Sequence, residues 1–156
     1  MVLERKEWMR ALTAHEAVEI HGLAERLVQG CEVRHQSLPQ AGLGLLTLSD
    51  GAFNEPYYLG EFPLSISCIE LHLSNGQRAQ GGAQVMVDDA DLARSLAILD
   101  AVLASRLPGW EEAADLIRTG EEKRREQAQR RNRILTSTRV DFSLLGTVDK
   151  GDEDNA

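Results

Sequence analysis

A change of hydrophobic period divides the chain into three parts and constrains its fold most strongly. Between residues 31 and 87 apolar and polar side chains alternate, as in "CEVRHQSL" and "LSISCIELHL", whereas the flanking residues follow a helical repeat. A period of two is typical of strands, and a spacing of three or four is typical of amphipathic helices. The sequence therefore predicts an α+β protein whose strands lie between N-terminal and C-terminal helices.

The Asn75-Gly76 pair predicts a hairpin within this sheet. It stands between "LSISCIELHL" and "QRAQGGAQVMV", and both of its residues tolerate a positive φ. The turn signals in residues 31–87 predict an antiparallel sheet of four to five strands. The apolar positions of "LSISCIELHL" are even-numbered up to Cys68 and odd-numbered from Ile69. We therefore expect a bulge or register irregularity at this point.

Helical repeats on both sides of the strands complete a predicted single domain of residues 1–138. A chain of 156 residues, 42% of them hydrophobic, is long enough to bury a core. Beyond the domain we expect an extended C-terminal arm and acidic tail, residues 139–156. The expected ranges are helices in 3–29, strands in 31–87 and helices in 89–135.

Three acidic residues, Asp88, Asp89 and Asp91, stand immediately before a stripe of leucines that begins at Leu92. Carboxylates in this position can accept hydrogen bonds from the free N–H groups of a first helical turn, and they face the positive end of the helix dipole. A metal site is the alternative. The adjoining leucine stripe favours the helix cap.

Composition argues against several classes of function. A net charge of −8 disfavours a general binder of nucleic acid or anionic membranes. No apolar run reaches the ~18 residues of a membrane-spanning helix, and the start "MVLERKEWMR" does not resemble a signal peptide. Cys31 and Cys68 form no metal or redox motif, so we expect two reduced thiols in a cytoplasmic protein.

Asp100 is a carboxylate that the helical repeat places on an apolar face. It lies four residues after Leu96 and three before Leu103. Burial without a partner costs several kcal/mol, so we expect a partly buried, hydrogen-bonded structural carboxylate, with Arg139 as one candidate partner. A catalytic acid is the alternative. No nucleophile or second acid shares its face.

Residues 118–139 form a strongly basic segment. A nucleic-acid-binding adaptor is one interpretation. Interleaved acids and the absence of aromatic residues favour a solvated helix with pairs spaced by four residues. Eight of the 17 Lys and Arg residues lie here: Arg118, Lys123, Arg124, Arg125, Arg130, Arg131, Arg133 and Arg139.

The segment "RVDFSLLG" has the pattern of a strand with one apolar face. We expect residues 139–145 to dock against a partner subunit or a second copy of the chain, with a fold back onto the chain's own sheet as the alternative. The expected interface residues are Arg139, Val140, Asp141, Phe142, Leu144 and Leu145.

An ordered set of short motifs resembles the PhnG subunit of the bacterial carbon–phosphorus lyase machinery over nearly the whole chain. The motifs are "RKEWMRAL" with "LAERL", "GLGLLTLSDGAFNEPYYLGE", "LHLSNG" with "LARSLAILDAVL", and "RVDFSLLG". Two turns depart from the family pattern. Val87-Asp88-Asp89 stands where Gly-Arg-Asp is common, and residues 50–54 replace a Gly-Gly-Thr-Gly loop.

The resemblance implies a subunit that acts with PhnH-, PhnI- and PhnL-like proteins to displace adenine from ATP with a phosphonate, yielding ribose 1-phosphonate 5-triphosphate. A PhnJ-like partner with an iron–sulfur cluster and S-adenosylmethionine then cleaves the C–P bond, and a PhnK-like ATPase is a further expected partner. We expect this chain to bind no cofactor or metal alone, to be homo-oligomeric within the hetero-oligomer, and to support the active site without carrying it. The alternatives are the nucleic-acid-binding adaptor and a stand-alone enzyme that uses Asp100 or the acids at 88–91.

Overall fold

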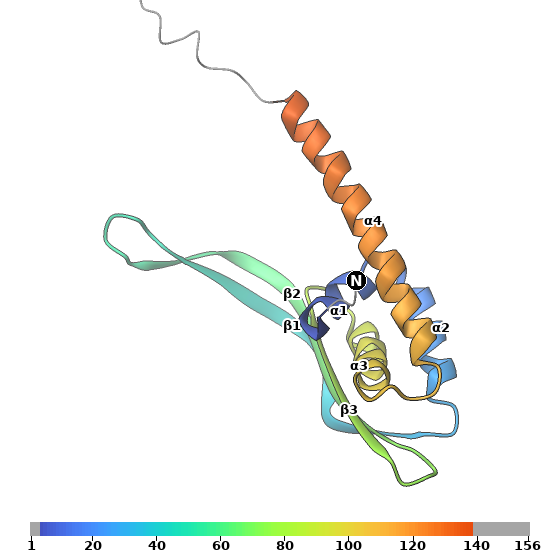
Figure 1. The fold of residues 1–156 in the computed structure, drawn as a ribbon. Coiled ribbons are helices and arrows are strands. Elements are labelled where there is room, and N and C mark those ends of the chain that lie inside the picture. Colours follow the sequence, from blue (N-terminus) through green and yellow to red (C-terminus); the bar gives the residue numbers. More distant parts are fainter. Residues whose placement is uncertain (1–3, 139–156) are drawn as a thin grey trace, which may run out of the picture. The chain divides into compact units, whose positions relative to one another are not determined.

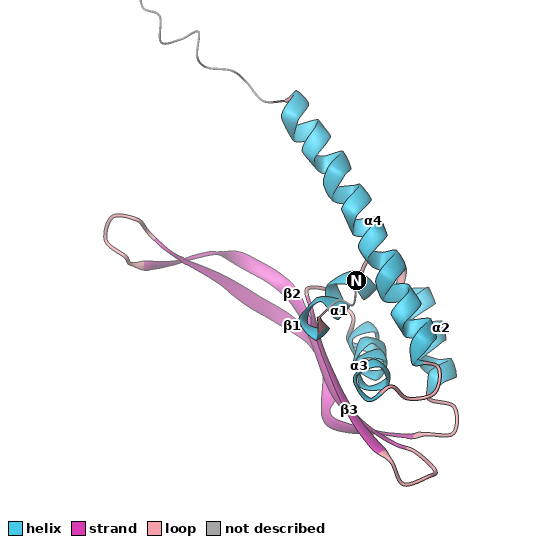
Figure 2. Ribbon diagram, viewed as in Figure 1, coloured by secondary structure: helices cyan, strands magenta, loops and turns pink. Residues whose placement is uncertain are grey.

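The computed structural model describes residues 4–138 and confirms the α+β class. Strands occupy the middle of the chain and helices occupy both ends (Figures 1 and 2). The elements are α1 (Arg5–Leu12), α2 (Ala17–Leu27), β1 (Glu32–Ser49), β2 (Pro56–His72), β3 (Arg78–Val85), α3 (Ala90–Ser105) and α4 (Trp110–Ser137).

The chain divides into two compact units, Met1–Arg124 and Arg125–Ala156. The first unit holds the sheet, α1 to α3 and the first half of α4. The described part of the second unit is the distal half of α4, whose side chains from residue 125 onward are exposed. The predicted boundary at residue 138 falls at the end of the described residues and stays a prediction.

The described residues form one antiparallel sheet of three strands in the order β1-β2-β3, so the prediction of four to five strands was wrong. Segments on either side of Pro39 are one continuous strand, β1, and those on either side of Pro63 are one continuous strand, β2. β1 is an edge strand with a register shift between Ser37 and Gln40. Edge strands and bulges tolerate the missing N–H of proline, which is why Pro39 does not end the strand.

The predicted hairpin is confirmed. The chain turns between β2 and β3 at residues 73–77, where Gly76 has a φ of 83°. The Gly76 N–H donates to the Leu73 carbonyl at 3.0 Å, and the Leu73 N–H donates to the Gln77 carbonyl at 2.9 Å.

The expected irregularity near Cys68 and Ile69 is present only in the pairing of β2 with β1. The register shifts between His35 and Ser37, opposite these two residues, whereas β2 pairs with β3 without a shift from Ser65 to His72. The change of buried face that the apolar pattern implied was wrong, because the odd-numbered residues from Ser65 to Leu71 are all buried and Ser65 and Ser67 continue the row of Ile69.

Helix α3 packs on the core face of the sheet, against β3 and β2 (Figure 1). Asp89 begins it as the predicted cap, with its carboxylate accepting from the Leu92 N–H at 2.8 Å. Ten of its residues are buried. The helix comes close to β3 because Gly81 has no side chain: a Cβ there would overlap the Ala97 carbonyl and Ala101. The packing of α3 on β3 therefore depends on a glycine.

The paired ends of β1 and β2 extend past β3 as a two-stranded ribbon. β3 pairs with β2 only from Ser65 to His72, so Gly42–Ser49 and Pro56–Leu64 pair with each other alone. In Figure 1 this hairpin projects away from α3. Residues 42–64 are called the ribbon below.

Candidate functional site

Asp100 lies in α3 with only 3% of its surface exposed. Its two oxygens accept hydrogen bonds from Arg5 Nε at 3.0 Å and from Arg5 Nη2 at 2.6 Å. The Gly82 N–H also donates to Oδ2, at 3.0 Å. The hydrogen bonds to Asp100 raise the pKa of Arg5 above its usual value. One carboxylate therefore ties α3 to both α1 and the outer edge of β3.

This geometry supports the structural role predicted for Asp100, which stays a prediction. Asp100 is buried and hydrogen-bonded, as expected, and Arg5 occupies both oxygens. Arg139, the candidate partner, lies outside the described residues. Little in the sequence indicated that Arg5 is the partner of Asp100. The two residues are 95 positions apart in the chain, and Arg5 lies in a segment with several other charged residues.

Polar residues gather at one end of the open face, which is the sheet face opposite α3 that carries the even-numbered residues of β2. The Glu70 carboxylate lies 2.6 Å from His72 Nε2, and this hydrogen bond lowers the pKa of Glu70. On β1, the Arg34 guanidinium donates two hydrogen bonds to Glu32 and lowers the pKa of its carboxyl. Each acid here pairs with a base two residues away on the same strand, so the charges on this part of the open face are matched locally.

The histidines occupy separate sites. His35 pairs with Ile69 and His72 pairs with Glu32, so the two do not meet across the strands. Buried His15 lies 2.8 Å from the Leu116 carbonyl and 3.0 Å from both Glu19 and Lys123. His21 contacts the Ser95 hydroxyl at 2.8 Å, but Ser95 is only 2% exposed inside α3. This hydroxyl is out of reach of a substrate.

Metal ligands do not converge in the part of the chain that the structure describes: residues 4–138 contain no group of three or more His, Cys, Asp or Glu that could hold an ion. Cys31 and Cys68 are free thiols. Over the same residues, no helix has the length and apolarity required to cross a membrane.

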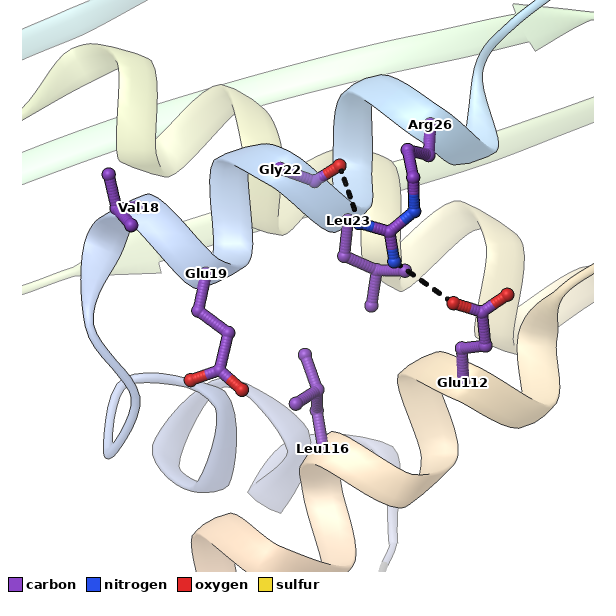
Figure 3. A pocket seen from close by; sticks show the side chains of 7 residues that line it. All are labelled: Val18, Glu19, Gly22, Leu23, Arg26, Glu112 and Leu116. Atoms are coloured by element: carbon purple, nitrogen blue, oxygen red, sulfur yellow. Dashed lines mark hydrogen bonds and ion pairs between the residues drawn. The ribbon is translucent and has the colours of Figure 1, made fainter.

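A hollow of about 260 Å³ lies between α2 and the first half of α4. Figure 3 shows Leu23 and Leu116 at its wall and an ion pair between Arg26 and Glu112, 3.0 Å long, across one side. Both charged side chains are more than half exposed, and Arg26 also donates to the Gly22 carbonyl. The full lining is Val18, Glu19, Gly22, Leu23, Arg26, Glu112 and Leu116. Arg26 and Glu112 pair with each other and Glu19 contacts His15, so the hollow lacks the converging free polar groups that orient a small ligand.

Exposed apolar side chains concentrate on the ribbon. Sequence reasoning missed this feature, although the run "GLGLL" with neighbouring "YYL" was its signal. Exposed fractions run from 40% at Leu48 to 80% at Phe53. The set is Leu43, Leu45, Leu46, Leu48, Phe53, Tyr57, Tyr58 and Leu59. Patches of this kind mark interaction surfaces more often than reaction centres.

The interface residues predicted from the sequence, Arg139 to Leu145, lie outside the described residues and stay a prediction. The ribbon is therefore the main candidate site within residues 4–138, and it has the character of a docking surface.

Fold and surface together define a small α+β protein with one helix-covered sheet face and a projecting apolar ribbon. The model of a family described as phosphonate metabolism protein PhnG matches residues 3–146, nearly the whole chain. The chain belongs to the PhnG family, as the motifs predicted. No curated protein matches it.

Proposed function

We propose that this chain is a cytoplasmic subunit of the carbon–phosphorus lyase core complex. In this proposal it acts with PhnH-, PhnI- and PhnL-like proteins in the displacement of adenine from ATP by a phosphonate, and it supports the active site of a partner. ATP is then a substrate of the complex. The iron–sulfur cluster and S-adenosylmethionine belong to the PhnJ-like subunit that acts afterwards.

The observation that carries this proposal is the family match over residues 3–146. The exposed ribbon supports it, because apolar side chains at 40–80% exposure are costly to leave in water. Burial of one such side chain contributes up to about 1.5–3 kcal/mol, so an assembly that covers several of them gains appreciable stability.

Reconstitution tests the proposal. The PhnH-, PhnI- and PhnL-like proteins are mixed with ATP and methylphosphonate, with and without this chain, and release of adenine is followed by chromatography. We expect adenine release only when the chain is present. Equal release without it would contradict the proposal.

The same preparation separates the rival functions. Adenine release by the chain alone would show a stand-alone enzyme. Salt-sensitive binding of RNA or duplex DNA, with no effect on adenine release, would show the nucleic-acid-binding adaptor.

A further inference from the structure

We propose that the ribbon inserts into a groove of a different subunit, and that this groove is apolar inside and carries Lys or Arg at its rim. The inference rests on the proposed function, since it names the surface by which the chain joins its complex.

The first observation is that the ribbon is apolar on both faces. Neighbouring residues of a strand point to opposite faces, so the consecutive leucines Leu45 and Leu46 lie on different sides. Their exposed fractions are 58% and 45%. A ribbon with one polar face needs cover on one side only. Two apolar faces require a partner that encloses the ribbon.

The second observation concerns the free edge of the ribbon. Within the described residues β1 is an edge strand, paired only with β2. Free edges are commonly protected by lysines, prolines or bulges. Residues 42–46 contain no charge or proline, and they pair with β2 in one register up to the shift between Leu46 and Thr47. An unprotected apolar edge of this kind is expected to be covered in the working assembly.

The third observation is the charge of the ribbon. No Lys or Arg occurs anywhere between Arg34 and Arg78. The ribbon itself carries three acids: Asp50, Glu55 and Glu61. Glu55 and Glu61 are exposed and form no ion pair with any described residue. Complementary potentials favour a partner with basic residues beside its apolar groove.

These charges disfavour a second copy of the chain as the occupant. Two ribbons packed together would bring three acids against three acids with no base between them. The basic distal half of α4 from a second copy would match the charge, but its exposed large apolar side chains are only Ile134 and Leu135. Two such residues are too few to cover the apolar set of the ribbon, so we assign the groove to a different subunit.

The ribbon also makes contacts within itself. The ring of Phe62 lies over Gly44, so closely that a Cβ at this glycine would overlap it. At the tip, Asp50 Oδ1 accepts from the Phe53 N–H at 2.7 Å, and the Asp50 N–H donates to the Glu55 carbonyl at 3.0 Å. A preformed ribbon loses less conformational entropy on insertion.

The test is capture of co-expressed PhnH-, PhnI- and PhnJ-like subunits by the affinity-tagged full chain. Leu45→Asp and Leu46→Asp place a charge on one face each, and Val18→Asp is the control, since Val18 is 80% exposed on α2. We expect each ribbon variant to lower capture at least tenfold with an unchanged melting temperature, and the control to behave as wild type. Wild-type capture by either ribbon variant would overturn the insertion.

Charge is tested separately with Glu55→Lys/Glu61→Lys. We expect this double variant to lose capture, and Glu55→Gln/Glu61→Gln to lose less. Equal capture by wild type and the lysine variant would overturn the basic rim. A photo-crosslinker at position 58 should label another subunit, and labelling of a second copy of this chain would overturn the assignment to a different subunit.

These experiments distinguish a wrong proposed function from a wrong role for the ribbon. If wild-type chain captured none of the three subunits, the proposed function would be wrong. If wild-type and ribbon variants captured them equally and supported adenine release, only the role of the ribbon would be wrong.

Discussion

Asp100 illustrates how a single charged residue can hold three elements together. Its carboxylate lies on the buried, mostly apolar face of α3. It accepts three hydrogen bonds, two from Arg5 and one from the Gly82 N–H. Arg5 is more than half exposed, so the pair sits at the border between core and solvent. Such a site loses stability chiefly when one partner is removed and the other is left unmatched.

The variant Asp100→Asn keeps the shape of the side chain and removes its charge. The amide N–H₂ of asparagine is a donor, and it would face another donor, either Arg5 or the Gly82 N–H. We therefore expect the free energy of unfolding to fall by about 1–3 kcal/mol. Urea denaturation measures it, with the exposed residue Asp115 changed to Asn as the control. A variant of unchanged stability that assembled normally but abolished adenine release would contradict the structural role.

Ser65 and Ser67 form a matched pair on the core face of β2. Both are fully buried, but their hydrogen bonding differs. The Ser65 hydroxyl donates to the Val87 carbonyl at 2.6 Å and accepts from the Asp89 N–H at 3.0 Å. The Ser67 hydroxyl has no hydrogen-bond partner among the described residues.

Alanine at these two positions should therefore have unequal effects. We expect Ser65→Ala to cost about 1–3 kcal/mol, because it leaves a carbonyl and an N–H near the start of α3 without partners. Ser67→Ala should change stability by less than about 0.5 kcal/mol or raise it slightly, because it removes an unsatisfied polar group. Thermal unfolding of the two single variants measures the difference, and equal losses would disagree with the hydrogen bonds described.

At the scale of elements, the contact of α3 with β3 depends on one of two adjacent glycines that face opposite sides of the sheet. A Cβ on Gly81 would overlap backbone atoms of Ala97 and Ala101. A Cβ on Gly82 would meet Cys68 Sγ at 3.6 Å, an ordinary contact. Neither glycine has a positive φ, so the difference between them is one of space.

We expect Gly81→Ala to destabilise the protein by about 3 kcal/mol, since helix backbone cannot move aside as a flexible side chain can. Gly82→Ala should stay within about 1 kcal/mol of wild type. Urea unfolding of both variants makes the comparison. A Gly81→Ala protein as stable as Gly82→Ala would show that α3 does not approach β3 so closely.

At the scale of the whole molecule, the prediction from the C-terminal pattern concerns assembly. A chain truncated after Thr138 lacks Val140, Phe142, Leu144 and Leu145. We expect it to bind the PhnH- and PhnI-like subunits less tightly while its melting temperature stays unchanged. Capture and calorimetry on the same preparation decide this, and a lowered melting temperature would instead indicate an arm that folds onto its own sheet.

The sequence by itself determined the features that depend on a few neighbouring residues. Asn75-Gly76 predicted the hairpin because positive φ is a local requirement, and the acids before Leu92 predicted the cap because free N–H groups lie within one turn. The helical repeat likewise predicted that Asp100 lies among leucines. The family followed from short motifs in order along the chain, and the match over residues 3–146 confirms it.

Only the tertiary structure decided which of these segments meet and which surfaces stay open. β1 continues through Pro39 and β2 continues through Pro63, because an edge position, a bulge and a two-stranded ribbon accommodate a proline. The described residues therefore form three strands and not the four or five expected. Arg5 is the ion-pair partner of Asp100 because of where α1 packs, and the sequence does not show this position. The apolar run of the ribbon is visible in the sequence, but its exposure became clear only from the end of β3 before it. Periodicity shows which face a strand can bury and not whether anything covers that face.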